Sequence, residues 1–175
     1  MQLPAITKEF VEKCIREFDE KNGLTERTIT RLVEKFTDNS ILENVLLKAC
    51  VINTFYNVRV LNKDLPGISQ YISSLAIDED FDRGIQEGAS ETVAKITACP
   101  KVKRKYYSFA TKYCSWHNQT SYPIYDGITE AMLWKYKKRD GKQAGFPKFR
   151  RKDLKNYERF RRVIDEFRRY YSSLE

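Results

Sequence analysis

The longest apolar segment, residues 40–61 (SILENVLLKACVINTFYNVRVL), constrains the fold more than any other part of the chain. A helix through this segment is apolar on nearly every side, as in a helix that is buried on most of its surface. Ser40 and Glu43 have the spacing of a capping box, which favours a helix start at this point. We therefore expect residues 40–61 to form the buried central helix of the core.

The rest of the chain repeats apolar residues at intervals of three and four, which indicates amphipathic helices. Asn22-Gly23 is a helix-stop signal, so separate helices are expected over residues 7–22 and 25–36. No segment shows the apolar–polar alternation of a strand. The predicted fold is all-α: a single compact domain over residues 1–175, with about eight helices and a basic C-terminal half.

Charge is distributed unevenly along the chain. Residues 1–100 carry 12 Lys and Arg against 16 Asp and Glu, whereas residues 101–175 carry 20 against 8, and the net charge is +8. A basic half of this kind favours an anionic partner, first a nucleic acid and second an acidic protein. A basic face that binds nothing specific is the alternative.

The four cysteines, Cys14, Cys50, Cys99 and Cys114, are far apart, and there is one histidine. This is not the spacing of a zinc site, so we expect free and mostly buried thiols and no metal or cofactor. There is no signal-like N-terminus and no apolar run of about 18 residues. We therefore expect a cytoplasmic protein without a membrane partner.

The stretch from Ser108 to Lys135 concentrates the rarer residues, including the histidine and both tryptophans. Aromatics repeat at helical spacing before His117, which is typical of a core but also suits stacking on unpaired bases. His117 is expected to end this helix, where the helix dipole favours its cation and its ring can cap free carbonyls, or to act as a general acid or base. Asp126 is expected to be the N-cap of the next helix, a carboxylate at the mouth of a groove, or both.

Basic runs precede and follow this stretch, and we expect them to hold phosphate groups if the partner is a nucleic acid. The predicted nucleic-acid-binding residues are Lys101, Lys103, Arg104, Lys105, Lys137, Lys138, Arg139, Lys148, Arg150 and Arg151.

The run FATKYCSWHNQTSYPIYDG resembles a motif of bacterial and phage helical proteins of uncharacterised function, of the form F-A-S-K-Y-x-x-F-H-N-x-x-x-x-P-I-Y-D-S. The run VLLKACVINTFYNVRVL resembles their central helix. That family is in turn distantly similar to the core of the helix-hairpin-helix DNA glycosylases, in which a Pro-Val-Asp loop places a catalytic aspartate at a helix start.

The glycosylase resemblance implies a catalytic role for Asp126, with Lys112, Lys105 or His117 assisting. The chain departs from the glycosylases at two places. Their glycine-rich turn is replaced by Cys99-Pro100-Lys101-Val102-Lys103, and their nucleophilic lysine by Ser108 or Tyr107.

Two hypotheses remain open from the sequence. In the first, the chain is a nucleic-acid-binding helical protein with a glycosylase-like core, with or without enzymatic activity. In the second, it is a non-enzymatic interaction factor whose basic C-terminal helix docks an acidic protein.

Overall fold

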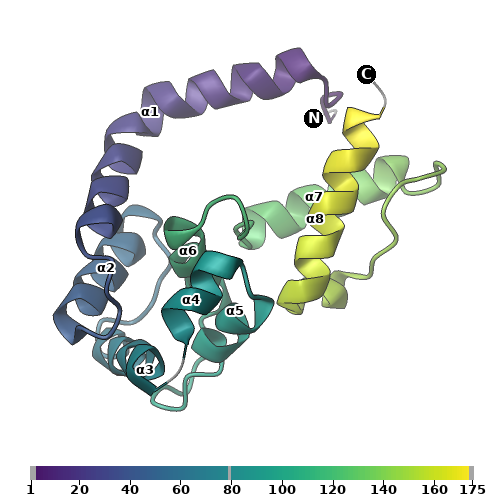
Figure 1. Ribbon diagram of the computed structural model, residues 1–175. Coiled ribbons are helices and arrows are strands. Elements are labelled where there is room, and N and C mark those ends of the chain that lie inside the picture. The colour runs from purple at the N-terminus through teal and green to yellow at the C-terminus, as the bar shows by residue number, and fades with distance from the viewer. Residues whose placement is uncertain (1–2, 79, 174–175) are drawn as a thin grey trace. The chain divides into compact units, whose positions relative to one another are not determined.

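The computed structural model describes residues 3–78 and 80–173, and every regular element within them is a helix (Figure 1). The predicted all-α class and the number of helices are confirmed. The elements are α1 (Lys8–Lys35), α2 (Leu42–Phe55), α3 (Leu65–Asp78), α4 (Phe81–Glu87), α5 (Ser90–Thr97), α6 (Tyr107–His117), α7 (Gly127–Asp140), the 3₁₀ helix η1 (Arg151–Lys155) and α8 (Tyr157–Ser172).

The chain divides into two compact units. Unit 1 comprises Met1–Leu24 and Tyr125–Glu175, and unit 2 comprises Thr25–Ile124. The predicted single domain over residues 1–175 stays a prediction. None of the helices within the described ranges has the length and apolar composition needed to cross a bilayer.

Helix α1 corrects the prediction of two N-terminal helices. It runs without interruption from Lys8 to Lys35, so Asn22-Gly23 does not stop it. The Asn22 side chain donates to the Phe18 carbonyl at 3.0 Å, a bond within the helix instead of a C-terminal cap. Gly23 costs a helix interior only about 1 kcal/mol relative to alanine, which a 28-residue helix tolerates.

Unit 2 is built from the end of α1 and from α2 to α6. Helix α2 packs against α3 and α6, and α6 also packs against α5. The most buried helix is α6, in which every residue from Phe109 to Trp116 is buried. The expected core role of Phe109, Tyr113 and Trp116 is confirmed.

Helix α2 differs from its predicted bounds at both ends. The capping box is absent, because the Ser40 hydroxyl donates to Asp38 and the helix begins only after Ile41. The helix ends at Phe55, and Asn57 beyond it has a φ of 45°. The following loop is held by Asn53, whose side chain bonds to both backbone groups of Val60 at 2.9 and 3.1 Å.

Unit 1 contains α7, η1 and α8 with the first part of α1. Rings from α7, the following loop and α8 meet edge to face, among them Tyr136, Phe146, Phe167 and Tyr171. The N-cap of α8 is Asn156, which accepts from the Arg159 amide at 3.0 Å.

Candidate functional site

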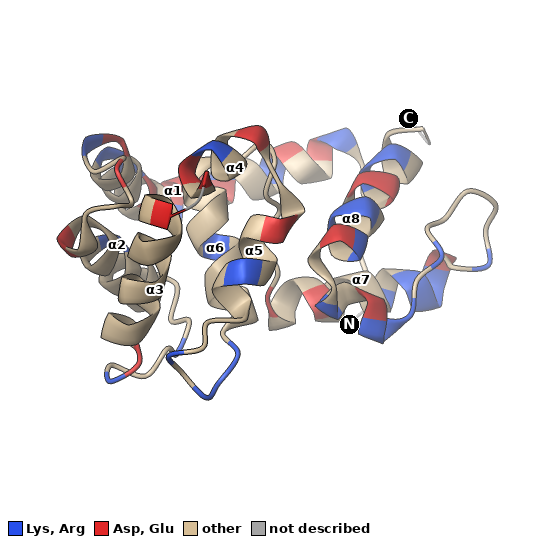
Figure 2. Cartoon of the chain, turned by 60° about the horizontal axis from the view of Figure 1, so that its bottom comes forward, with Lys and Arg blue, Asp and Glu red and all other residues tan. Residues whose placement is uncertain are grey.

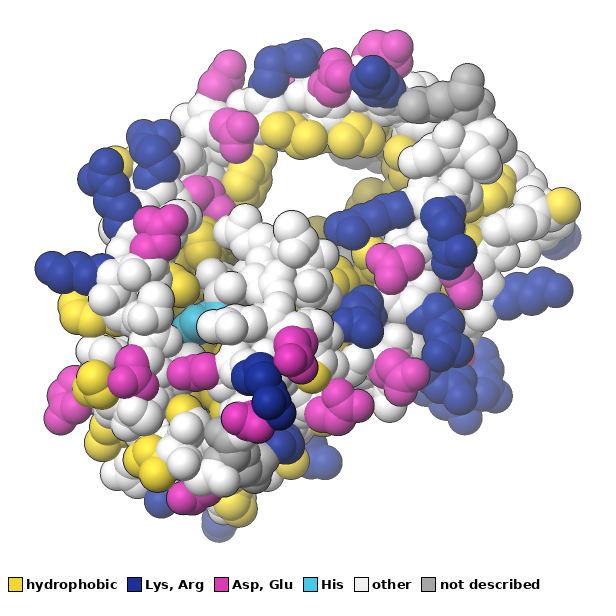
Figure 3. Space-filling model, viewed as in Figure 1, with side chains coloured by type: hydrophobic (Ala, Val, Ile, Leu, Met, Phe, Trp, Pro, Cys, Tyr) yellow, Lys and Arg dark blue, Asp and Glu magenta, His cyan; other side chains and the backbone are white. Residues whose placement is uncertain are grey.

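His117, the last residue of α6, lies half-buried at the surface of unit 2, where its ring is visible in cyan in Figure 3. Its Nδ1 is 2.8 Å from the Tyr113 carbonyl oxygen, and its Nε2 is 3.1 Å from Lys48 Nζ. A carbonyl can only accept, so Nδ1 carries the proton and Nε2 accepts from the lysine. The prediction that the ring caps a helix carbonyl is confirmed.

Lys48 is fully buried in α2 and uses all three of its N–H donors. Besides His117, its Nζ donates to the Phe36 carbonyl at 2.7 Å and to Asn39 Oδ1 at 2.7 Å. Asn39 Oδ1 also accepts from the Tyr113 hydroxyl at 2.5 Å. These partner groups come from α6 and from the segment after α1, so Lys48 joins α2 to both of them.

Asn39 connects this network to a carboxylate. Its Nδ2 donates to Asp82 Oδ1 at 2.5 Å, and its backbone amide lies 3.3 Å from Asp82 Oδ2. The network therefore runs from His117 through Lys48 and Asn39 to Asp82 on α4, and we call these four residues with Tyr113 the buried polar network. A network of this kind is stable only if every member is satisfied.

Burial decides the protonation of this network. It lowers the pKa of Lys48 to about 8, although the charges of Asp82 and Asp38 oppose the shift. Burial and the charge of Lys48 lower the pKa of His117 to about 4. The imidazole is therefore neutral at pH 7, and the expectation of a cation stabilised by the helix dipole is wrong, because desolvation outweighs the dipole.

A pocket of about 410 Å³ opens beside the buried polar network. Its walls contain the carboxylates of Glu34 and Asp82 together with the rings of Trp116 and His117. The volume is within the range of small-molecule sites. Among the described residues, no three His, Cys, Asp or Glu side chains converge as a metal site would require.

Lys112 lies five residues before His117 on α6 but is almost completely buried. Its Nζ donates to Ser108 Oγ at 3.0 Å and lies 5.8 Å from the centre of the Tyr56 ring. These contacts hold the ammonium group inside unit 2.

Asp126 is the N-cap of α7 and belongs to unit 1, whereas His117 and Lys112 belong to unit 2. Its Oδ1 accepts from the Thr129 amide at 2.8 Å, so the predicted cap is confirmed. A catalytic role for Asp126, His117 or Lys112 stays a prediction.

Replacing Asp126 with alanine is expected to lower the free energy of unfolding by about 1 kcal/mol, because the Thr129 amide loses its acceptor. Asparagine keeps that acceptor, so Asp126→Asn should change stability by less than about 0.5 kcal/mol. Urea unfolding followed by circular dichroism measures both. Equal losses in the two variants would contradict the capping role.

The basic run before α6 lies on the surface of unit 2. Lys101, Lys103, Arg104 and Lys105 are all exposed in the loop between α5 and α6. Lys101 contacts Gln70 Oε1 at 3.3 Å, and the Arg104 guanidinium lies over the Tyr106 ring. All four cations are accessible to an anionic partner.

Three of the predicted binding residues in unit 1 already have partners inside it. Lys137 donates to the Phe149 carbonyl, and Arg139 forms a two-pronged ion pair with Asp140 at 2.8–2.9 Å. Arg151 donates to Glu130 at 2.7 Å. The contacts of Lys137 and Arg151 join α7 to the following loop and to η1.

The other predicted residues of unit 1 are more accessible. Arg150 is exposed and lies 3.7 Å from Asp153. Lys138 and Lys148 are exposed and form no ion pair within the described part of the chain. Figure 2 shows the cations gathered at the C-terminal end of α7 and in the segment after it.

Lys138 is part of a larger arrangement. Lys135 and Lys142 lie three residues before and four residues after it, which places the three side chains on one helix face. Gly141 keeps right-handed helical backbone angles beyond the end of α7, so Lys142 continues this face. We call Lys135, Lys138 and Lys142 the lysine row; all three are exposed.

The sequence of this chain matches a known protein family over part of its length. The HI_0787_N family, described as an N-terminal domain, matches residues 10–121, more than half of the chain. The chain belongs to the HI_0787_N family. The range that the HI_0787_N family matches contains the whole buried polar network, whereas Asp126 and the lysine row lie beyond it.

Comparison with a single relative also leads to a protein of uncharacterised function. An uncharacterised protein of Haemophilus influenzae is 35% identical over 136 residues, which cover 76% of this chain and 63% of that protein. The chain therefore spans less than two thirds of the relative's length. No solved structure matches this member of the HI_0787_N family.

Two features of this HI_0787_N member were missed in the sequence. Lys48 is the one charged residue between Asn44 and Asn57, in a segment otherwise apolar enough to be buried, and that contrast could have marked it. The spacing of Lys135, Lys138 and Lys142 could have marked the lysine row. Asn39, Asp82 and Tyr113 carried no such signal, because only the fold brings them to Lys48.

Proposed function

We propose that this chain binds nucleic acid, with the lysine row of α7 as the principal contact for phosphate groups. Three exposed ammonium groups on one helix face suit a phosphate backbone, which attracts cations without regard to sequence. The loop with Lys101, Lys103, Arg104 and Lys105 is a second basic surface, on unit 2.

The observation that carries the proposal is the pairing of the acids near the lysine row. Glu130 is bound by Arg151 and Lys155, Asp140 by Arg139, and Asp153 lies near Arg150 and Arg159. Residues 125–175 carry 15 Lys and Arg against 8 Asp and Glu. The charge of the lysine row is therefore left uncompensated by these neighbours and is available to an anion.

The proposal is limited to binding. The resemblance to DNA glycosylases would add base release by Asp126, assisted by His117 or Lys112. The nitrogen atoms of His117 and Lys112 already take part in contacts within unit 2, which favours a structural role for both.

Binding to labelled 20-nucleotide single strands and duplexes, followed by fluorescence anisotropy, tests the proposal. The affinity for the duplex should fall by about 40-fold between 50 and 200 mM salt if about three phosphates are neutralised. Replacing the three lysines of the row with glutamate should weaken binding at 100 mM salt by about 30-fold and make the salt dependence shallower.

A matched control exists on α1, where Arg27, Arg31 and Lys35 are exposed at intervals of four residues. Replacing these three with glutamate makes the same change in net charge and should lower the affinity only severalfold. An equal loss of affinity in both triple variants would show that net charge, and not the position of the lysines, determines binding. An affinity independent of salt would refute the proposal.

Docking of an acidic protein is the second candidate, favoured by the exposed arginines of α8, Arg159, Arg162, Arg168 and Arg169. Capture experiments with and without nuclease separate the two functions. Partners that disappear after nuclease treatment support nucleic-acid binding, whereas a protein that remains bound supports docking.

A further inference from the structure

The N-terminal half of α1 carries an apolar stripe that the rest of unit 1 does not cover. Its members follow one another at helical spacing, and Val11, Ile15 and Phe18 are 42%, 54% and 47% exposed. Figure 3 shows hydrophobic side chains in yellow following one edge of α1. We call Phe10, Val11, Cys14, Ile15 and Phe18 the α1 stripe.

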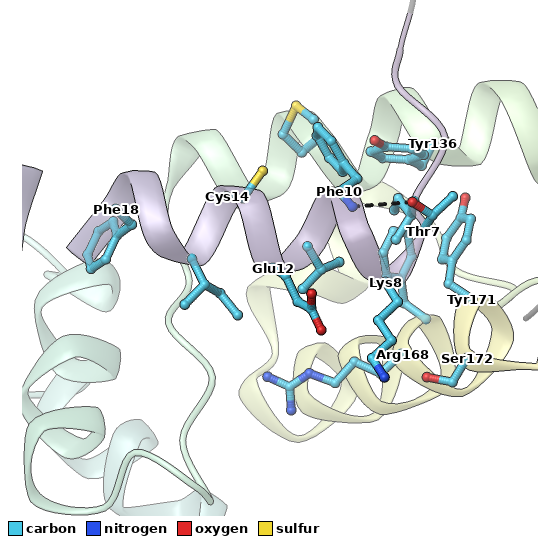
Figure 4. Close-up of a pocket in the computed structure, with 15 residues that line it drawn as sticks. Thr7, Lys8, Phe10, Glu12, Cys14, Phe18, Tyr136, Arg168, Tyr171 and Ser172 are labelled. Carbon is cyan, nitrogen blue, oxygen red and sulfur yellow. Dashed lines mark hydrogen bonds between the residues drawn. The ribbon is translucent and has the colours of Figure 1, made fainter. Parts of the chain in front are cut away.

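The α1 stripe forms one wall of a groove of about 720 Å³ within unit 1 (Figure 4). The other walls are apolar side chains of α7 and α8, among them Met132, Tyr136, Phe167 and Tyr171. In Figure 4, Tyr136 and Tyr171 lie at the end near Thr7, whereas Phe18 lies at the far end. An exposed apolar surface of this kind is typical of an interaction site.

The charges along the α1 stripe indicate what covers it. Lys8 and Asp19 are 11 residues apart, about three helical turns, so they lie on the same edge of the stripe near its two ends. Both are exposed, and neither has an ion-pair partner among the described residues. The charges of residues 8–24 nearly cancel, with four Lys and Arg against five Asp and Glu.

We propose that the occupant of the groove is a second copy of this chain, whose α1 stripe packs antiparallel to the first. With Cys14 opposite Cys14, Phe10 of each copy lies opposite Phe18 of the other, because both are four residues from the centre. In the same register Lys8 of each copy lies within one residue of Asp19 of the other. A two-fold axis brings the same edge of both helices together, so this ion pair forms twice.

Parallel packing of the two α1 helices is less favourable than antiparallel packing. In a parallel two-fold pair, the edge with Lys8 and Asp19 faces the other edge of the partner's stripe, so the ion pair between Lys8 and Asp19 does not form. A near-neutral helix also gives no preference for a strongly acidic partner. The balance of charge on α1 therefore favours self-association.

Analytical ultracentrifugation over a concentration series is the first test, and the expected mass is twice the 20.7 kDa of one chain. Ile15→Asp places a charge in the apolar contact of both copies and should raise the dimer dissociation constant by at least about 100-fold. A chain that stays monomeric at all concentrations, or a dimer unaffected by Ile15→Asp, overturns the proposal.

Charge exchange tests the direction of pairing. Lys8→Asp should raise the dimer dissociation constant by about tenfold, and combining it with Asp19→Lys should restore the original value. Arg16→Asp is the matched control, since Arg16 lies on the opposite face of α1 and should leave the constant unchanged. Failure of the double exchange to restore dimerisation overturns the antiparallel register.

Cysteine oxidation gives an independent test. Mild oxidation should link the dimer through Cys14, and the link should vanish in Cys14→Ser but persist in Cys50→Ser. Circular dichroism of each variant checks that the helices are retained. A disulfide-linked dimer that survives Cys14→Ser contradicts the register.

Discussion

Replacing Lys48 with methionine is expected to lower the free energy of unfolding by about 3 kcal/mol. Methionine has a similar length but no donor, so the Phe36 carbonyl and His117 Nε2 lose their partner inside the protein. Each buried acceptor without a donor costs about 1–3 kcal/mol. Removing the desolvation cost of the cation offsets part of this loss but not all of it, because the acceptors around it remain.

Urea unfolding can be followed in unit 2 alone. In a Trp134→Phe background, Trp116 is the one remaining tryptophan and reports on α6. Lys63→Met is the matched control, because Lys63 is exposed and its replacement should change stability by less than about 0.5 kcal/mol. Equal effects of the two substitutions would show that the Lys48 contacts contribute nothing to stability.

Acidification from pH 6.5 to pH 4 is expected to lower the free energy of unfolding by about 3 kcal/mol through His117 alone. The pKa of the ring is about 4 in the folded chain and near 6.5 when it is exposed on unfolding. The unfolded chain therefore takes up the proton first, and stability is lost as the pH falls through this window. A difference of one pKa unit corresponds to about 1.4 kcal/mol.

His117→Gln isolates this contribution, because His117 is the only histidine in the chain. Glutamine keeps an acceptor for Lys48 but does not titrate, so the variant should lose most of its pH dependence between pH 6.5 and pH 4. Unfolding curves collected at half-unit intervals measure the difference. A variant as sensitive to pH as the parent would show that His117 is not desolvated in the folded chain.

Helical periodicity predicted the class of the fold because it is a local property of the sequence. The end of α6 at His117 and the cap at Asp126 also followed from local signals, and both agree with the structure. The stop at Asn22-Gly23 failed because a single glycine is a weak signal when the helix continues on both sides. The predicted end of α2 was wrong because apolar character alone does not continue a helix. The Asn53 side chain binds the backbone of Val60 and holds the residues after Phe55 in a loop.

The candidate site was less accessible from the sequence. His117 could be singled out as the one histidine, but its neutral state depends on its burial in the fold and on the charge of Lys48, which is 69 residues away. The basic runs identified the segments of the expected nucleic-acid-binding surface. They did not show which of their cations are free to bind phosphate and which are engaged in contacts within the protein. Lys137, Arg139 and Arg151 belong to the same runs as Lys138 yet are engaged within unit 1.

The partners of Lys48 also affect how fast unit 2 can fold. They lie 9, 12 and 69 residues away along the chain, so no local event can satisfy the ammonium group. The lysine must lose its water as α2 becomes buried, and its contact with α6 forms only when the most distant segment arrives. Non-local contacts slow folding, and the loss of hydration adds to that barrier. Unit 2 should therefore reach its native state more slowly than a helical bundle of its size that has an apolar residue at this position.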